Sequence, residues 1–159
     1  MRILGIDPGL RIAGYGCVEF TLPSPTPKPI EAGAIKLKQG DSTSSRLKTL
    51  FENISEVIQD VKPDIIAVET VFTHKDRVST ATILGYARGV ILLAGEQASL
   101  ELLEITPAEI KKSVTGNGRA TKEQVQHAVQ NILCLTEPPN PSDVADALAI
   151  AITAGLRSI

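Results

Sequence analysis

The first third of the chain carries short apolar runs separated by glycine, proline and polar residues, which predicts β-strands. The runs indicate strands at residues 2–6, 13–20 and 30–37. Between the last two strands, a proline occupies every second position from Pro23 to Pro29. Because proline has no N–H to donate to a β-ladder, we expect an exposed, stiff hairpin loop in this segment.

The pattern then changes to a helical period. Apolar residues fall on one face of a predicted helix over 44–61, which Pro63 ends. The following segment, DIIAVE at residues 64–69, holds four consecutive apolar residues. A run that is apolar on both faces is typical of a central strand covered by helices on both sides.

A longer, largely apolar helix is predicted over 78–98. On one of its faces, Ala81, Gly85 and Gly89 lie four residues apart. Small residues allow another backbone to come close, and that backbone belongs either to the core of the same chain or to a second subunit. We favour packing inside the monomer.

Capping sequences place the remaining helices. A short strand over 100–105 is followed by TPAE, a capping box with proline at the first helical position, and TKEQ further on is a second capping box. Asn140 caps, with Pro141, a last helix that runs toward Leu156. This order predicts a single α/β domain over 1–159, with a mixed sheet that is antiparallel first and parallel later.

Acidic residues stand at the ends of predicted strands and at the start of the last helix. Asp7 ends the first strand and Glu69 ends the buried one, where open α/β sheets collect ligand chemistry. Asp143 and Asp146 project from one face of the last helix because they are three residues apart. If the two strands are parallel neighbours, all four carboxylates converge.

Each acid also has a plain structural interpretation. Asp7 could be a turn residue and Glu69 a charged residue at the end of a strand. Asp143 could stabilise the helix N-terminus, and Asp146 could belong to a solvated helix face. Four converging carboxylates would, however, repel one another unless cations neutralise them. Oxygen ligands without His or Cys favour Mg²⁺ or Mn²⁺ over zinc. We therefore predict a site for Mg²⁺, with Mn²⁺ able to substitute, that holds two ions and suits two-metal phosphodiester chemistry.

Composition and charge bear on nucleic-acid binding, zinc binding and cellular location. A net charge of −2 gives no global sign of nucleic-acid binding, so any basic surface must be local. Cys17 and Cys134 belong to no Cys/His cluster, which argues against zinc and favours buried free thiols in a reducing compartment. The chain has neither a signal segment nor an apolar run long enough to cross a membrane, so we expect a soluble cytoplasmic protein without a membrane partner.

Four blocks of sequence together resemble one family. GIDPGLRIAGYG, AVETVF, GNGRATKEQVQHAV and SDVADALAIAI occur in the order of RuvC, the bacterial Holliday-junction resolvases, and the similarity runs from Arg2 to about Thr153. The resemblance implies a ribonuclease H-like fold with a five-stranded mixed sheet flanked by helices. It also implies a homodimer that makes paired, symmetric nicks in four-way DNA junctions during recombination and repair, and that works with the RuvA–RuvB branch-migration complex. The nicks would carry 5′-phosphate and 3′-hydroxyl ends.

The same resemblance implies roles for single residues. The family's catalytic, metal-binding acids correspond to Asp7, Glu69, Asp143 and Asp146. Phe72 matches an aromatic residue that stacks on bases, and Lys111 and Lys122 match lysines near the scissile phosphate. Further candidates for a basic, DNA-contacting rim are Arg11, Lys75 and Arg119. Without the resemblance, we would interpret Phe72 as a core side chain and each of these cations as a solvated surface charge.

Two positions depart from the usual family pattern. Thr70 stands where Gln is common, and Asp76 stands where Asn is common. An acid at position 76 would repel phosphate in a loop that faces DNA.

Three other functions are compatible with parts of the sequence. A ribosomal-RNA-processing nuclease family also opens with GIDPG but is expected to lack the Phe72 loop and the GNGRATKEQVQ block. An ATP-binding protein of the actin and sugar-kinase type needs two such domains, which 159 residues cannot hold. An inactive junction-binding scaffold would not need all four acids.

Overall fold

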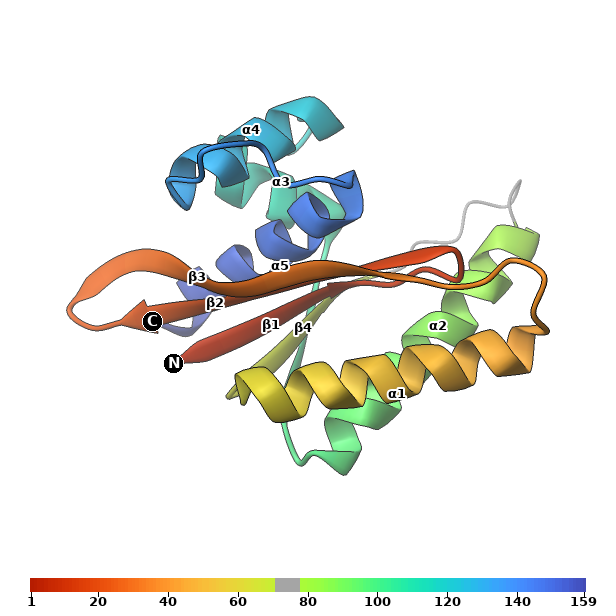
Figure 1. Cartoon of the computed structure of the whole chain (residues 1–159). Helices are drawn as coiled ribbons and strands as arrows, with labels where there is room; N and C mark the ends of the chain where they lie inside the picture. The colour runs from red at the N-terminus through yellow and green to blue at the C-terminus, as the bar shows by residue number, and fades with distance from the viewer. Residues whose placement is uncertain (71–77) are drawn as a thin grey trace.

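A five-stranded sheet forms the framework of the computed structural model, which describes residues 1–70 and 78–159 (Figure 1). The strands are β1 (Arg2–Asp7), β2 (Ile12–Thr21), β3 (Ser24–Lys36), β4 (Ile65–Glu69) and β5 (Glu101–Ile105). They are arranged in the order β3-β2-β1-β4-β5. The β1–β2 and β2–β3 pairs are antiparallel, whereas β1–β4 and β4–β5 are parallel. The predicted mixed sheet is confirmed.

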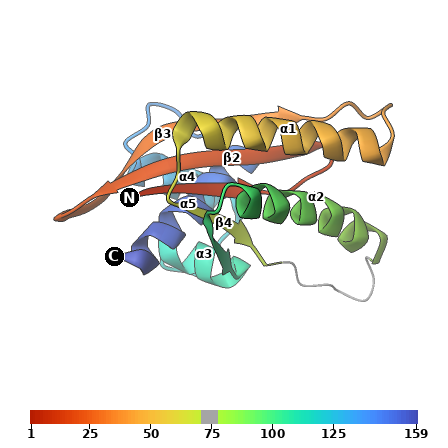
Figure 2. The same ribbon diagram turned by 90° about the horizontal axis from the view of Figure 1, so that it is seen from below.

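Helices cover both faces of this sheet (Figures 1 and 2). On one face lie α1 (Thr43–Val61) and α2 (Val78–Gln97), and on the other lie α5 (Ser142–Ser158), α3 (Pro107–Thr115) and α4 (Lys122–Ile132). Of these three, α5 packs directly on the sheet, and α3 and α4 pack outside it. None of the helices in the described part of the chain is long and apolar enough to cross a membrane.

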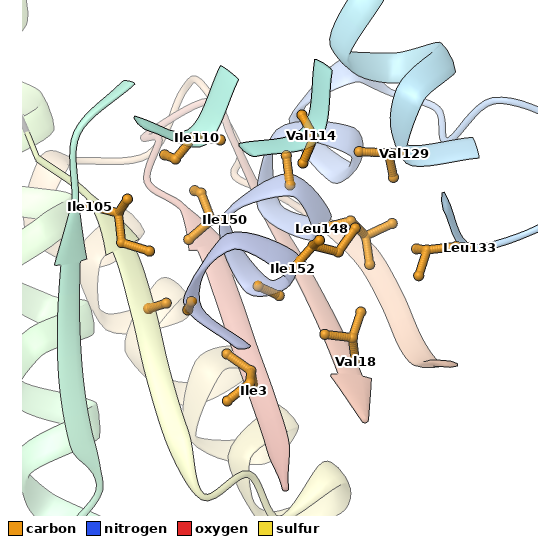
Figure 3. Close-up of a cluster of buried hydrophobic side chains, with 14 of the residues drawn as sticks. Ile3, Val18, Ile105, Ile110, Val114, Val129, Leu133, Leu148, Ile150 and Ile152 are labelled. Carbon is orange, nitrogen blue, oxygen red and sulfur yellow. The ribbon is translucent and has the colours of Figure 1, made fainter. Parts of the chain in front are cut away.

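Alternation along β1 divides the hydrophobic core in two. Ile3 belongs to the cluster under α5, and Leu4 and Ile6 belong to the cluster under α1 and α2. Figure 3 shows the first cluster, in which Leu148 of α5 lies among side chains of the sheet, α3 and α4. Because successive strand residues point to opposite faces, Asp7 points to the α5 side, as Ile3 does.

Side-chain caps start two of the helices as expected. Both capping boxes are present, at Thr106 before α3 and at Thr121 before α4. The start of α5 differs, because its N-cap residue is Pro141 and no side chain caps it. Asn140 is therefore not the cap that the sequence suggested.

The proline-rich segment is the clearest departure from the sequence-based expectation. β3 already begins at Ser24, and Pro29 pairs with Val18 in a ladder that contains two register shifts. β3 is an edge strand, and only an edge strand can place prolines where their missing N–H would have faced solvent. The expected loop is thus an extension of the β2–β3 hairpin, at the end of the sheet where both termini lie (Figure 1).

The small residues of α2 do not pack inside the monomer, contrary to our prediction. A Cβ atom at Gly85 or Gly89 would meet nothing within 4 Å, and both residues are exposed. The helix contacts the core instead through Ala87, Ile91 and Ala94. Its outer face leaves three large apolar side chains 44%, 50% and 51% exposed, namely Ile83, Tyr86 and Leu93.

The two cysteines differ in their surroundings. Both are free, but Cys17 is buried whereas Cys134 is exposed. Only Cys17 therefore fits the prediction of a buried thiol.

Glycines set the distance between α5 and the sheet. A Cβ atom at Gly5 of β1 would lie 2.1 Å from the carbonyl oxygen of Ala147, and one at Gly14 of β2 would lie 2.0 Å from that of Asp143. Atoms do not approach so closely, so only glycine fits at these positions. The backbone of α5 consequently rests directly on β1 and β2.

We expect Gly5→Ala to lower the free energy of unfolding by about 1–3 kcal/mol, because the added methyl group would force α5 away from β1. Urea denaturation followed by circular dichroism measures this change. Gly40→Ala is the matched control, since a Cβ atom there meets nothing within 4 Å. Equal stability of the two variants would contradict the role assigned to the close approach.

Candidate metal centre at the carboxyl edge of the sheet

Two carboxylates are brought together by the pairing of parallel strands. Ile6 of β1 pairs with Val68 of β4, so the next residues, Asp7 and Glu69, end neighbouring strands at the same edge. The sequence-based condition for their convergence, that β1 and β4 are parallel neighbours, is therefore met. This edge lies at the end of the sheet away from the two termini (Figure 1).

The first two turns of α5 bring the other two acids to the same edge. Gly14 pairs with Asp7 across the β1–β2 ladder, and it is at Gly14 that the backbone of Asp143 rests on the sheet. Asp146 follows one turn later and lines a pocket of about 230 Å³ together with Asp7 and Glu69. Asp143 instead lines an adjoining, larger groove. The carboxylates thus span two neighbouring hollows.

The electrostatics of this cluster are unfavourable to its negative charges. Burial first, and then the charges of the Asp146, Asp143 and Glu69 carboxylates, raise the pKa of Asp7 from 3.8 to about 8. Burial, and then the charge of Asp146, also raises the pKa of Glu69. The pKa of Asp146 is raised by burial although Lys122 lies beside it.

Two lysines offset part of this negative charge. Lys111 of α3 and Lys122 of α4 line the pocket, and Lys122 Nζ lies 3.4 Å from Asp146 Oδ2. The negative charge of Asp146 is the main reason why the pKa of Lys122 is raised. Pro107, Ile110 and Val125 give the pocket an apolar wall.

The donor set fits a divalent cation. All four groups are carboxylates, and burial and their mutual repulsion raise the pKa of Asp7 even with Lys122 nearby. Among the described side chains, no three Asp, Glu, His or Cys residues already have the spacing of a formed metal site. A cation would therefore have to draw the carboxylates closer together than they stand here.

Arg88 is a residue near this site that sequence reasoning missed. It lies on α2 and donates hydrogen bonds to the carbonyl oxygen of Glu69 and to the carboxylate of Glu104. Its side chain is only 14% exposed, whereas the side chain of Glu104 is 46% exposed. Arg88 thereby fixes the end of β4, where Glu69 stands. The signal in the sequence was a single cation within the apolar run ILGYARGVILL.

The remaining predicted residues have different positions. Arg11 lines the larger groove beside Asp143. Arg119 is exposed in the turn before α4 and lines neither hollow. Phe72 and Lys75, like Asp76, lie outside the described residues.

Comparison with known proteins identifies the family. The family model described as crossover junction endodeoxyribonuclease RuvC matches residues 3–154. The chain belongs to this family. The RuvC of Moorella thermoacetica is 46% identical over 152 residues, which are 96% of this chain and 89% of that protein. The RuvC of Desulforamulus reducens is 44% identical over 152 residues, 96% of this chain and 91% of the relative.

Solved structures agree with this assignment. Thermus thermophilus RuvC in complex with a Holliday junction substrate has a TM-score of 0.92 and 31% identity, over 99% of this chain and 94% of that one. The yeast mitochondrial Holliday junction resolvase Ydc2 has a TM-score of 0.67 at 13% identity, over 98% of this chain and 80% of that one, and so shares the fold alone. The RuvC resemblance seen in the sequence, with its ribonuclease H-like fold, is confirmed.

The raised pKa of Asp7 predicts how the stability of this protein depends on pH. The folded protein holds the Asp7 proton up to a pH of about 8, whereas an unfolded chain releases it near 3.8. Without metal, the free energy of unfolding should therefore fall as the pH rises between these values. Asp7→Asn should remove the part of this dependence that Asp7 causes, although Glu69 and Asp146 keep theirs. It should also raise the melting temperature at pH 8 in EDTA by about 2–4 °C for each kcal/mol gained.

Differential scanning calorimetry in EDTA across this pH range measures the effect. Asp60→Asn, which changes an exposed residue of α1, serves as the control. An Asp7→Asn protein that melts at or below the wild-type temperature throughout would show that the Asp7 carboxylate is not destabilising.

Proposed function

We propose that this protein is a Holliday-junction resolvase, a metal-dependent endonuclease that makes paired, symmetric nicks in four-way DNA junctions during recombination and repair. The nicks would leave 5′-phosphate and 3′-hydroxyl ends. The observation that carries the proposal is the gathering of Asp7, Glu69 and Asp146 in one pocket, with Asp143 at its border. The RuvC relative solved with a Holliday junction supports the choice of substrate.

In this proposal the four acids bind Mg²⁺, with Mn²⁺ able to substitute and two ions in each active site. When bound, such ions activate a water molecule and stabilise the leaving oxygen. Asp7 and Glu69 hold their positions because they end paired strands, and Asp143 and Asp146 because α5 rests on the sheet. Hard carboxylate oxygens suit this class of cation.

The cations around the pocket would bind the DNA backbone. Lys111 and Lys122 line the carboxylate pocket and would attract the scissile phosphate toward the acids. Arg11 and Arg119 would extend this basic surface on either side. Phe72 and Lys75 complete the proposed contacts, with Phe72 stacking on bases near the crossover.

Two symmetric nicks require two active sites, and we include a homodimer in the proposal for this reason. The exposed apolar side chains of α2 form a surface that a second copy of the chain would cover. Gly85 and Gly89 would let the partner's backbone come close on this face. The RuvA–RuvB complex, implied by the family resemblance, is the further proposed partner.

The proposed activity is tested with a synthetic four-way junction and a linear duplex of the same sequence. We expect paired nicks in the junction alone, in Mg²⁺ but not in EDTA. Asp7→Asn should reduce cleavage to background and still bind the junction, because it removes a metal ligand only, whereas Asp60→Asn should cleave normally. Cleavage in EDTA would contradict the metal mechanism, and cleavage of single-stranded RNA in place of the junction would contradict the substrate.

The proposed α2 interface predicts the effect of a charge placed on it. Leu93→Glu should raise the dimer dissociation constant at least about 100-fold, because a two-fold interface would bring the two new carboxylates together. Analytical ultracentrifugation measures the change. Leu22→Glu is the matched control, since Leu22 is 72% exposed at the hairpin end of the sheet. An unchanged dimer in Leu93→Glu would rule out this face as the interface.

A further inference from the structure

A groove adjoins the carboxylate pocket on the other side of the sheet edge. The turn from Pro8 to Ile12, the start of α1 and the first half of α2 surround a hollow of about 900 Å³. Asp143 belongs to its lining, and the charge of the Asp143 carboxylate also acts on Asp7 in the smaller pocket. The two hollows therefore meet at the first turn of α5.

The groove is basic, and its positive charge is not paired internally. Arg11 and Arg46 both line it. Within residues 1–70 and 78–159, no carboxylate lies within ion-pair distance of either guanidinium. In a protein with a net charge of −2, two arginines without an acidic partner in one hollow indicate an anionic ligand.

One edge of the Arg46 guanidinium has no hydrogen-bond partner among the described residues. Its Nη1 atom donates a hydrogen bond to the carbonyl oxygen of Leu10 at 2.9 Å, which holds the side chain against the turn after Asp7. Its Nε atom is buried and has no hydrogen-bond partner among the described residues. A buried donor without an acceptor costs free energy, and the Nε–Nη2 edge of arginine matches two oxygens of a phosphate.

Arg11 lines the same groove as Arg46, and its backbone is held in place by the surrounding turn. It follows Asp7 by four residues, through a turn so tight that a Cβ atom at Gly9 would lie 2.0 Å from the carbonyl oxygen of Ile12. The backbone oxygen of Arg11 also accepts a hydrogen bond from Leu37 at 2.9 Å. The turn that carries Arg11 is thus held against the end of β3, and it directly follows the strand that carries Asp7.

We propose that Arg46 and Arg11 form a binding site for a backbone phosphate of the DNA strand, on the opposite side of the acids from Lys111 and Lys122. This inference rests on the proposed function. Lys111 and Lys122 belong to α3 and α4, which lie on the opposite face of the sheet from α1 and α2 (Figure 2). The groove is lined mainly by the turn after β1 and by residues of α1 and α2. A DNA strand that crosses the carboxyl edge of the sheet would then be bound through its backbone on both sides of the scissile phosphate.

The test measures binding of a fluorescent four-way junction by anisotropy in EDTA, where no cleavage occurs, over a series of salt concentrations. We expect Arg11→Ala and Arg46→Gln each to weaken binding about tenfold. Each should also reduce the slope of log K against log salt by about 0.9, the value for one lost phosphate contact. Arg46→Lys should restore the slope but not the full affinity, because lysine keeps the charge and loses the two-point contact.

Lys48→Gln is the matched control for Arg46→Gln. It removes one positive charge from the same helix at a side chain that is 75% exposed and lies outside the groove. Unchanged slopes in both arginine variants would overturn the phosphate site. The role of Arg46 would then be to hold the turn after Asp7 through its hydrogen bond to Leu10. Arg11→Ala keeps the test decisive if Arg46→Gln does not fold, because Arg11 is exposed. A wild-type protein that binds no junction would instead overturn the proposed function, and the phosphate site with it.

Discussion

The direct contact between α5 and the glycines of β1 and β2 is the constraint on which the site depends. Gly5 and Gly14 leave no room for a Cβ atom between the strands and the helix backbone. The helix therefore has one position relative to the sheet, with its first two turns at the carboxyl edge. Without this contact, Asp143 and Asp146 would not reach the acids that end β1 and β4. The fold thus brings the four acids to one edge of the sheet before any ligand binds, and a cation then has to draw them closer together.

Gathering the four acids at one edge is electrostatically unfavourable. Burial, together with the charges of the three neighbouring carboxylates, raises the pKa of Asp7 to about 8 although Lys122 lies nearby. The free energy that apolar burial provides elsewhere, including the buried run of α5 from Val144 to Gly155, maintains this unfavourable arrangement. A site with these properties gains stability from a cation, which explains why a metal-dependent function suits the fold better than a purely structural role for the acids.

The sequence predicted the sheet and the position of the acids because both follow from local patterns. Apolar runs gave the strands, and Asp7 and Glu69 could be placed at strand ends without knowledge of the fold. Contacts between elements that are far apart in the sequence could not be predicted in this way. Whether the prolines before Ile30 join a ladder depends on β3 being an edge strand, and the outward direction of Gly89 depends on which face of α2 meets the core. The bonds of Arg88 to β4 and β5 are likewise long-range.

The central claim is that the four acids form one metal centre. An anomalous difference map from crystals of the protein soaked in Mn²⁺ tests it most directly. The account predicts two peaks about 3.5–4 Å apart, bounded by Asp7, Glu69, Asp143 and Asp146. Ordered Mn²⁺ bound elsewhere, with none at these carboxylates, would contradict it.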